Sequence, residues 1–222
     1  MADSSITDWL NFALAFFAGG AALYQYNRNS RGERDKLRRE QATKAADEME
    51  KFNNDHAVNV ALRMIDWDRG FVTLKNSDGT FRNIHVGTQE FLLALRHHSH
   101  PRDAVPDYDQ ARDKVFAANK NDPDWRHLFS IDEQGIRDLF DTFLGRLERM
   151  EALIRKGVIS PDDFQDYFSY WLEVMGEIPP KNGNLQVFVA QKRQALWAYI
   201  RCYEFGGVIR LFERYGRTAP IA

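Results

Sequence analysis

The stretch of sequence that decides the fold is residues 130–157, which read SIDEQGIRDLFDTFLGRLERMEALIRKG. Apolar residues recur along it every three or four positions, a spacing that predicts one amphipathic helix. Ser130 and Glu133 form a capping box at its start, and Gly157 is a typical C-terminal stop. The helix therefore has two defined ends and one face to bury. That face comprises Ile136, Leu139, Phe140, Phe143, Leu147, Met150 and Ile154.

Two further helices are predicted after this one. Ser160 and Pro161 begin the first, because a serine cap and a proline in the first turn favour a helix start. It ends before Pro179. The last helix is predicted from about Leu185 to Tyr215, where Gly206–Gly207 would either bend it or allow another helix to pack closely. The apolar face of the first of these helices comprises Phe164, Phe168, Trp171, Leu172 and Met175.

Upstream of residue 130 the pattern predicts shorter elements. A helix is expected over Phe52–Asp66, and a β-hairpin over Phe71–Leu74 and Thr80–Ile84 around the turn-forming run NSDG. Short helices follow at Phe91–His97 and Tyr108–Ala118. The predicted fold class is therefore mainly α: an N-terminal transmembrane helix, then a helical-bundle-like cytosolic domain with a small β-hairpin.

Composition limits the function classes. The chain has 222 residues, 44% hydrophobic and 28% charged, which is globular composition with room for one domain plus an anchor. A formal net charge of −2 provides no overall basic field for nucleic acid. Cys202 is the single cysteine, so an internal disulfide and a cysteine-rich zinc site are both excluded.

The N-terminal run WLNFALAFFAGGAALYQYN, residues 9–27, contains no charged side chain. At about 1.5 Å per residue it is roughly 28 Å long, close to the hydrocarbon thickness of a bilayer. Aromatic residues lie at both ends, where their rings favour the headgroup region. We therefore predict a membrane span and contact with membrane lipid. Its marker residues are Trp9, Phe12, Phe16, Phe17, Leu23, Tyr24 and Tyr26.

Two alternatives to a membrane span are a cleaved signal peptide and a helix buried in a soluble core. A cleaved signal peptide needs a basic start, but Met1–Asp8 contains no Lys or Arg. A helix buried in a soluble core is the other, since Asn11 and Gln25 moderate the hydropathy. The span is favoured because its apolar character runs all round the helix.

A basic cluster directly after the span predicts its orientation. Positive residues stay on the cytoplasmic side, so the N-terminus is expected outside a bacterial inner membrane and the large domain inside. The same side chains are candidates for anionic lipid headgroups. They are Arg28, Arg31, Arg34, Lys36, Arg38 and Arg39.

Small residues four apart within the span, Ala15 with Gly19 and Ala18 with Ala22, would let two helices approach closely. A homo-oligomer is therefore a candidate assembly, although chance in an alanine-rich run explains the spacing equally well. The predicted domains are residues 1–27 for tail and span, 28–51 for a charged solvated connector with Gly32 as an interruption, and 52–222 for the helical cytosolic domain.

Candidate chemistry is sparse. His97, His98 and His100 cluster before Pro101, where a solvated loop explains them better than a metal site. Cys202 is interpreted as a core thiol. No phosphate-binding glycine motif or nucleophile motif occurs. The acidic residues of the two predicted helices fall mostly between apolar positions, toward solvent. These are Asp138, Asp141, Glu148, Glu151, Asp162, Asp163 and Asp166.

The last predicted helix mixes basic and aromatic side chains, which is compatible with an RNA or anionic-ligand groove and equally with a half-buried helix. The half-buried interpretation is favoured. Its basic members are Lys192, Arg193, Arg201, Arg210, Arg214 and Arg217, and its aromatic members Trp197, Tyr199, Tyr203, Phe212 and Tyr215.

The run DLFDTFLGRLERMEALIRKGVISPDDFQDYFSYWL, residues 138–172, resembles a group of bacterial proteins of unassigned activity. These have one N-terminal span, a charged connector and a helical cytosolic domain. The likeness extends over about Phe52 to Tyr203, and its motif is a core pattern. It implies a membrane-tethered module and carries over no catalytic residue.

The predicted function is accordingly a membrane-anchored helical module that binds an unidentified protein partner, or itself, at the cytoplasmic face. No catalytic residue, cofactor or metal site is assigned, and nucleic acid is not the expected partner. One alternative is a membrane-tethered enzyme or effector with a site assembled from scattered residues, the His97–His100 region first among them. The other is anionic-ligand or nucleic-acid binding by the C-terminal helix.

Overall fold

The computed structural model describes residues 3–75, 79–178 and 187–219. It describes the side chains of all of these except residues 3–24, 27, 187 and 188. Within the part so described, no helix has a stretch long and apolar enough to cross a membrane. Of the predicted span markers, only Tyr26 has a described side chain, and it is 70% exposed. The other span markers and the predicted helix–helix contact residues all lie in the stretch whose side chains are not described. They are Trp9, Phe12, Ala15, Phe16, Phe17, Ala18, Gly19, Ala22, Leu23 and Tyr24.

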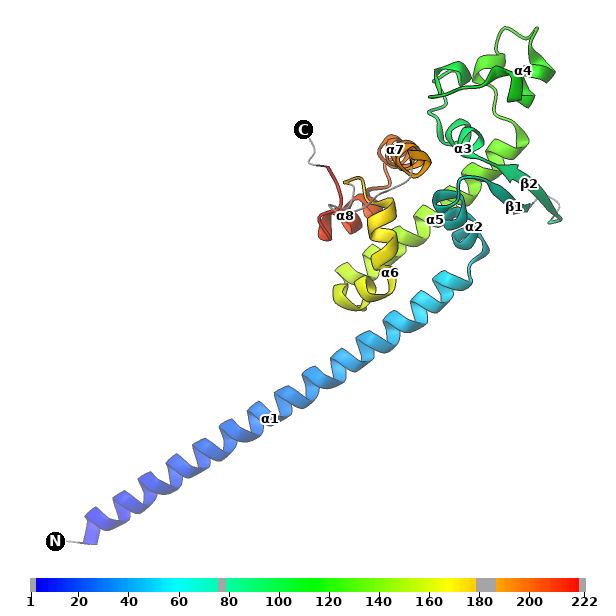
Figure 1. Ribbon diagram of the computed structural model, residues 1–222. Coiled ribbons are helices and arrows are strands. Elements are labelled where there is room, and N and C mark those ends of the chain that lie inside the picture. Colours follow the sequence, from blue (N-terminus) through cyan, green and yellow to red (C-terminus); the bar gives the residue numbers. More distant parts are fainter. Residues whose placement is uncertain (1–2, 76–78, 179–186, 220–222) are drawn as a thin grey trace.

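The N-terminal helix α1, Asp3–Asn54, is continuous and extends far from the rest of the chain (Figure 1). Gly32 does not interrupt it, which corrects the predicted break. The basic residues from Arg28 to Arg39 all lie on an exposed part of this helix. The basic part of the predicted connector, residues 28–39, is therefore a projecting helix whose basic side chains face water.

The last turns of α1 belong to the packed domain. Ala45, Met49 and Phe52 are buried. The Phe52 ring lies 6.2 Å from that of Phe143 and 5.6 Å from that of Phe168. Core packing thus starts inside the segment 28–51 that the composition assigned to the connector.

Helix α5, Ile131–Arg155, is the central element of the domain. It packs against α2, His56–Asp66, against α3, Thr88–Leu95, and against α8, Gly206–Arg214. The predicted caps are confirmed: the Glu133 amide donates to Ser130 Oγ at 3.1 Å and the Ser130 amide to Glu133 Oε2 at 3.2 Å. Gly157 has φ +68°, the left-handed backbone that a helix stop favours.

The predicted hairpin is confirmed as a two-stranded antiparallel sheet. Strand β1, Gly70–Lys75, pairs with β2, Phe81–Val86, so that Val72 faces Ile84. Two strands are not stable alone. Here their inner face is buried against the helices, with Val72, Leu74, Ile84 and Val86 in the core.

The segment between α3 and α5 is mostly irregular. It contains 3-10 turns at Arg102–Ala104, Gln110–Arg112 and Trp125–His127, and the short helix α4, Lys114–Asn119. The prediction of one helix over Tyr108–Ala118 was wrong in its first half. Asp113 is the reason, because its carboxylate caps α4 by accepting from the Val115 amide at 2.8 Å.

The predicted single C-terminal helix is also corrected. The chain forms α7, Val187–Cys202, and then α8, separated at Tyr203–Phe205, where Glu204 has φ +57°. A left-handed residue ends a helix because it redirects the backbone. Helix α6, Pro161–Met175, starts at the predicted Ser160 cap and ends at Met175.

Candidate functional site

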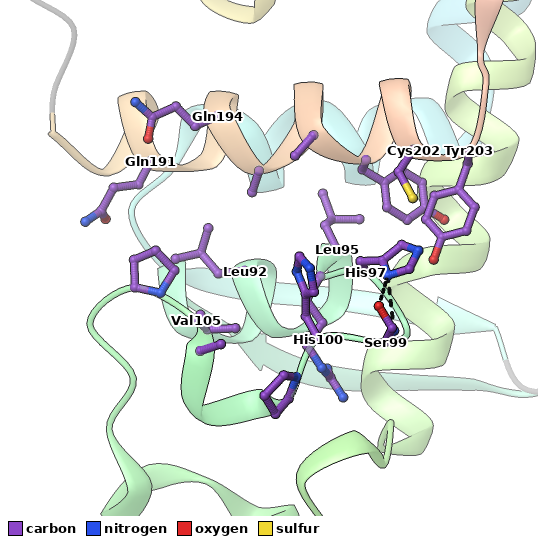
Figure 2. A pocket seen from close by; sticks show the side chains of 17 residues that line it. Leu92, Leu95, His97, Ser99, His100, Val105, Gln191, Gln194, Cys202 and Tyr203 are labelled. Carbon is purple, nitrogen blue, oxygen red and sulfur yellow. Dashed lines mark hydrogen bonds between the residues drawn. The ribbon is translucent and has the colours of Figure 1, made fainter.

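A groove of about 720 Å³ lies between α7 on one side and α3 with the turns that follow it on the other (Figure 2). Its volume is within the range of small-molecule sites. The apolar lining comes from Leu92 and Leu95 of α3, from Val105, and from Ala195 and Ala198 of α7. Polar side chains lie at both ends, with His97, Ser99, His100, Cys202 and Tyr203 at one and Gln191 and Gln194 at the other.

Helix geometry explains how α7 supplies one wall. Gln191, Gln194, Ala195, Ala198 and Cys202 are three or four residues apart, so they share one face of the helix. Small residues at the two middle positions leave space above α3. The face of α7 that points into the core carries large residues instead, such as Leu196 and Ile200.

The opposite wall depends on an abrupt turn after α3. Arg96 is extended, with φ −61° and ψ 154°, and ends the helix. The His97–His100 turn is closed by the His100 amide, which donates to the His97 carbonyl at 2.9 Å. Pro101 then starts the next 3-10 turn. The turn brings His97 to the end of the groove nearest Tyr203, with His100 next to it (Figure 2).

Five side chains gather there, and we call them the basic end of the groove: His97, His100 and Tyr203, which line the groove, and His98 and Arg137, which contact Tyr203. The ring centroid of His97 lies 4.0 Å from that of His98, 5.4 Å from that of His100 and 6.2 Å from that of Tyr203. The Tyr203 hydroxyl accepts a hydrogen bond from Arg137 Nη2 at 2.8 Å. It also lies 3.3 Å from His98 Nδ1.

Arg137 has no acidic partner among the described residues. Its Nη1 donates to the carbonyls of Ala94 and Arg96, each at 3.0 Å, and its Nη2 to Tyr203. Its guanidinium lies 4.7 to 5.1 Å from the ring centroids of Phe129, Tyr199 and Tyr203. All of these partners are uncharged, so the positive charge of Arg137 is not neutralised by an ion pair.

The groove is lined by basic side chains and by no Asp or Glu. The basic ones are Arg96, which pairs with Glu133 at 3.1 Å, and His97 and His100. Partial burial lowers the pKa of His97 below its ordinary value, and the positive charges of His98, His100 and Arg137 lower it further. An anion near these groups would oppose the electrostatic part of that shift. The basic end is thus suited to receive negative charge.

A buried ion cluster holds in place the irregular segment after α3, which forms the wall of the groove opposite α7. Arg102 is 1% exposed and donates to both Asp113 oxygens, at 2.6 and 2.9 Å, and to both Glu133 oxygens, at 2.8 and 2.6 Å. Arg96 Nη1 also donates to Glu133, at 3.1 Å from Oε2. Tyr108 donates to Asp113 at 2.9 Å. Two arginines and two carboxylates therefore tie the irregular segment to the start of α5.

Sequence reasoning missed this cluster. Glu133 was predicted only as the partner of Ser130 in the capping box, and Arg102 and Asp113 lie in a segment without periodicity. Residues 11 and 31 apart meet only through the fold. The one local signal was Asp113 before a short apolar run, which is a helix-cap pattern.

Several predicted roles need correction. Cys202 is exposed at the end of α7 and lines the groove, so it is not a core thiol. Glu151 is only 2% exposed and pairs with Arg155 at 3.4 Å and Arg210 at 3.6 Å, in place of facing solvent. Over the described residues, no group of three or more His, Cys, Asp or Glu side chains could hold a metal ion.

The C-terminal basic and aromatic residues do not form one surface. Trp197, Tyr199 and Phe212 are buried in the core. Lys192 is 1% exposed and donates to the carbonyls of Met64 at 2.8 Å and of Trp67, beyond the last turn of α2. These side chains are structural members of the domain.

Comparison with known proteins returned no matching family model, no matching curated protein and no matching solved structure. The resemblance of residues 138–172 to single-span bacterial proteins therefore stays a prediction.

Proposed function

We propose that the protein is a membrane-anchored helical module that binds a protein partner, or a second copy of itself, at the cytoplasmic face of a bacterial inner membrane. One observation carries this proposal: α1 projects from the domain, and its contacts with the domain start at Gln41, whose Nε2 donates to the Gly157 carbonyl at 2.8 Å. An uncharged apolar run, residues 9–27, belongs to the projecting part. A run of this kind needs cover from outside the chain, and a bilayer provides it.

The exposed basic helix supports the same proposal. Arg28 to Arg39 follow the apolar run on a stretch that faces water. Positive charge there favours the cytoplasmic side and anionic headgroups, at about 1 kcal/mol per residue near the surface. The domain would then be held a short helical distance below the bilayer, with its other surfaces free for a partner.

Membrane fractionation tests the anchor. The full chain expressed in a bacterial host is expected in the membrane fraction and to resist extraction by alkaline carbonate. Replacing Phe16 and Phe17 with Arg should release it, because each arginine at a span centre costs about 2.5–3.5 kcal/mol of insertion free energy. The matched control is Leu37→Arg, at an exposed position of the same helix. A full chain recovered without membranes would contradict the proposal.

Light scattering on the detergent-solubilised chain tests assembly. A homo-oligomer or a stoichiometric co-purifying protein is expected. A monodisperse monomer without a partner would contradict the proposed partner binding. It would not bear on the membrane anchor, which the fractionation tests. The enzyme alternative has its own specific observation, which is the gathering of His97, Ser99, Cys202 and Tyr203 at one end of the groove.

A further inference from the structure

We propose that the groove between α3 and α7 binds a small anionic amphiphile, with one apolar chain along the two helices and a carboxylate head at the basic end. This inference goes beyond the proposed anchor and partner binding, and it holds whether or not α1 enters a bilayer. It depends on two independent features of the groove, which are the distribution of its apolar lining and the imbalance of its charge.

The apolar part favours a narrow chain. Leu92, Leu95 and Val105 lie on the side of the groove opposite α7 (Figure 2), and Ala195 and Ala198 of α7 also line the groove. Burying each methylene group of a ligand between such walls strengthens binding about fourfold. The two alanines provide the space, because larger side chains at these positions of α7 would fill it.

The charge favours a single negative group. Arg137 has a permanent positive charge, and its hydrogen bonds go only to uncharged oxygens. Among the described residues, no acidic side chain forms an ion pair with Arg137: Asp141 accepts from the Tyr199 hydroxyl at 2.6 Å, and Glu133 is held by Arg96 and Arg102. A carboxylate at the basic end would complement Arg137 through charge and accept hydrogen bonds from the imidazoles.

A cationic or neutral amphiphile fits less well. The groove lining provides no carboxylate for a cation, and a neutral head leaves Arg137 without a counter-charge. The opposite end offers only the amides of Gln191 and Gln194, and Gln191 already donates to Asp107 at 2.6 Å. The polarity of the groove therefore sets one orientation, with the head toward Tyr203 and the tail toward Gln191.

Octanoate is the probe, because it is soluble and combines one apolar chain with one carboxylate. Binding of labelled octanoate to the full chain is measured by equilibrium dialysis in phosphatidylcholine nanodiscs, with empty nanodiscs subtracted, or in buffer if the chain needs no lipid. Saturable binding is expected. Octanol, which has only the tail, should bind about tenfold more weakly, and acetate, which lacks six methylene groups, at least about a hundredfold more weakly.

Cys202 gives a second readout on the unaltered chain, since it is the single cysteine, is exposed and lines the groove. Its reaction with N-ethylmaleimide, an uncharged reagent, should slow about fivefold or more at saturating octanoate, because an occupied groove restricts access to the thiol. Octanol at the same concentration should protect much less.

Two pairs of variants locate the binding. Ala198→Trp fills the groove at an exposed position and should abolish octanoate binding, whereas Ser169→Trp, at an exposed position of α6, should retain it. His100→Glu adds negative charge at the basic end and should weaken binding about fivefold, whereas His85→Glu, on the hairpin, should not. Far-UV circular dichroism checks that each variant is folded.

Several results would overturn the inference. Equal affinity for octanoate and octanol would show an apolar cleft without a preference for charge. Binding that survives Ala198→Trp would place the ligand elsewhere. The absence of saturable octanoate binding, together with an unchanged maleimide rate, would show that the groove takes no such ligand, whatever the outcome of the membrane fractionation.

Discussion

At the scale of single residues, Arg102 connects the turn after α3 to the cap of α4 and to the start of α5. Its five N–H groups meet Asp113, Glu133 and the Leu128 carbonyl. Burial alone would raise the pKa of Asp113, but hydrogen bonds and charge from Arg102, together with the Phe116 amide and the Tyr108 hydroxyl, lower it overall. The carboxylate therefore stays ionised inside the protein.

Arg102→Met should destabilise the fold by about 3–5 kcal/mol, because it leaves two buried carboxylates without their main partner. Arg126→Met is the matched control: its pair with Asp103, at 3.6 Å, is exposed, and such pairs contribute about 0–1 kcal/mol. Urea denaturation at neutral pH measures both. Equal losses for the two variants would show that the buried cluster does not fasten the segment.

Lys192 gives a prediction of pH dependence. Burial lowers its pKa to about 8, although Asp68, Asp66 and Glu90 act in the opposite direction. In the unfolded chain a lysine keeps its proton up to about pH 10.4. Between these values the unfolded state binds more protons, so stability should rise as the pH increases from 8. Measured between pH 7.5 and 9.5, the increase should be present in the unaltered chain and absent in Lys192→Met.

At the scale of the elements, the contact between α8 and α5 depends on a glycine. A Cβ at Gly207 would lie 2.9 Å from Glu148 Cγ and 3.0 Å from its Cβ, and Glu148 Oε1 accepts from the Gly207 amide at 2.9 Å. The two helices can approach this closely only because position 207 has no side chain. The sequence offered Gly206–Gly207 as a bend or a close contact, and the structure shows the contact at Gly207.

Gly207→Ala should therefore destabilise the fold by about 1–3 kcal/mol, as overpacking does. Gly145→Ala is the matched control on α5, since nothing lies within 4 Å of a Cβ added there. That change should stabilise by about 0.5–1 kcal/mol, the helix preference of alanine over glycine. Thermal unfolding should shift in opposite directions for the two variants, and a common sign would contradict the packing described.

Elements with strong local signals were predictable and the others were not. The start of α5 at Ser130, the start of α6 at Ser160 and the hairpin follow from caps, period and turn residues, all within a few positions of one another. The break before α8 was missed because Glu204 is left-handed without being glycine. The groove was missed because α3 and α7 are about a hundred residues apart in sequence. Only packing brings Leu95 and Ala198 to the same groove.

At the scale of the whole molecule, a projecting helix is attached to a packed domain by its last turns (Figure 1). Phe52→Ala should lower the free energy of unfolding by about 3–5 kcal/mol, because the Phe52 side chain is only 2% exposed and packs against Phe143 and Phe168. Leu37→Ala, 54% exposed on the same helix, should cost little. Urea denaturation followed by tryptophan fluorescence compares them. Equal effects would mean that α1 is not part of the cooperative domain.

The orientation of the chain in a membrane is the most direct test of the central claim. Cys202 labels the domain, and Ser4→Cys combined with Cys202→Ser labels the N-terminal tail. In intact bacterial spheroplasts, a membrane-impermeant maleimide is expected to react with the cysteine at position 4 and to reach Cys202 only after lysis. Reaction of Cys202 in intact spheroplasts, or recovery of both proteins in the soluble fraction, would contradict a module anchored with its domain in the cytoplasm.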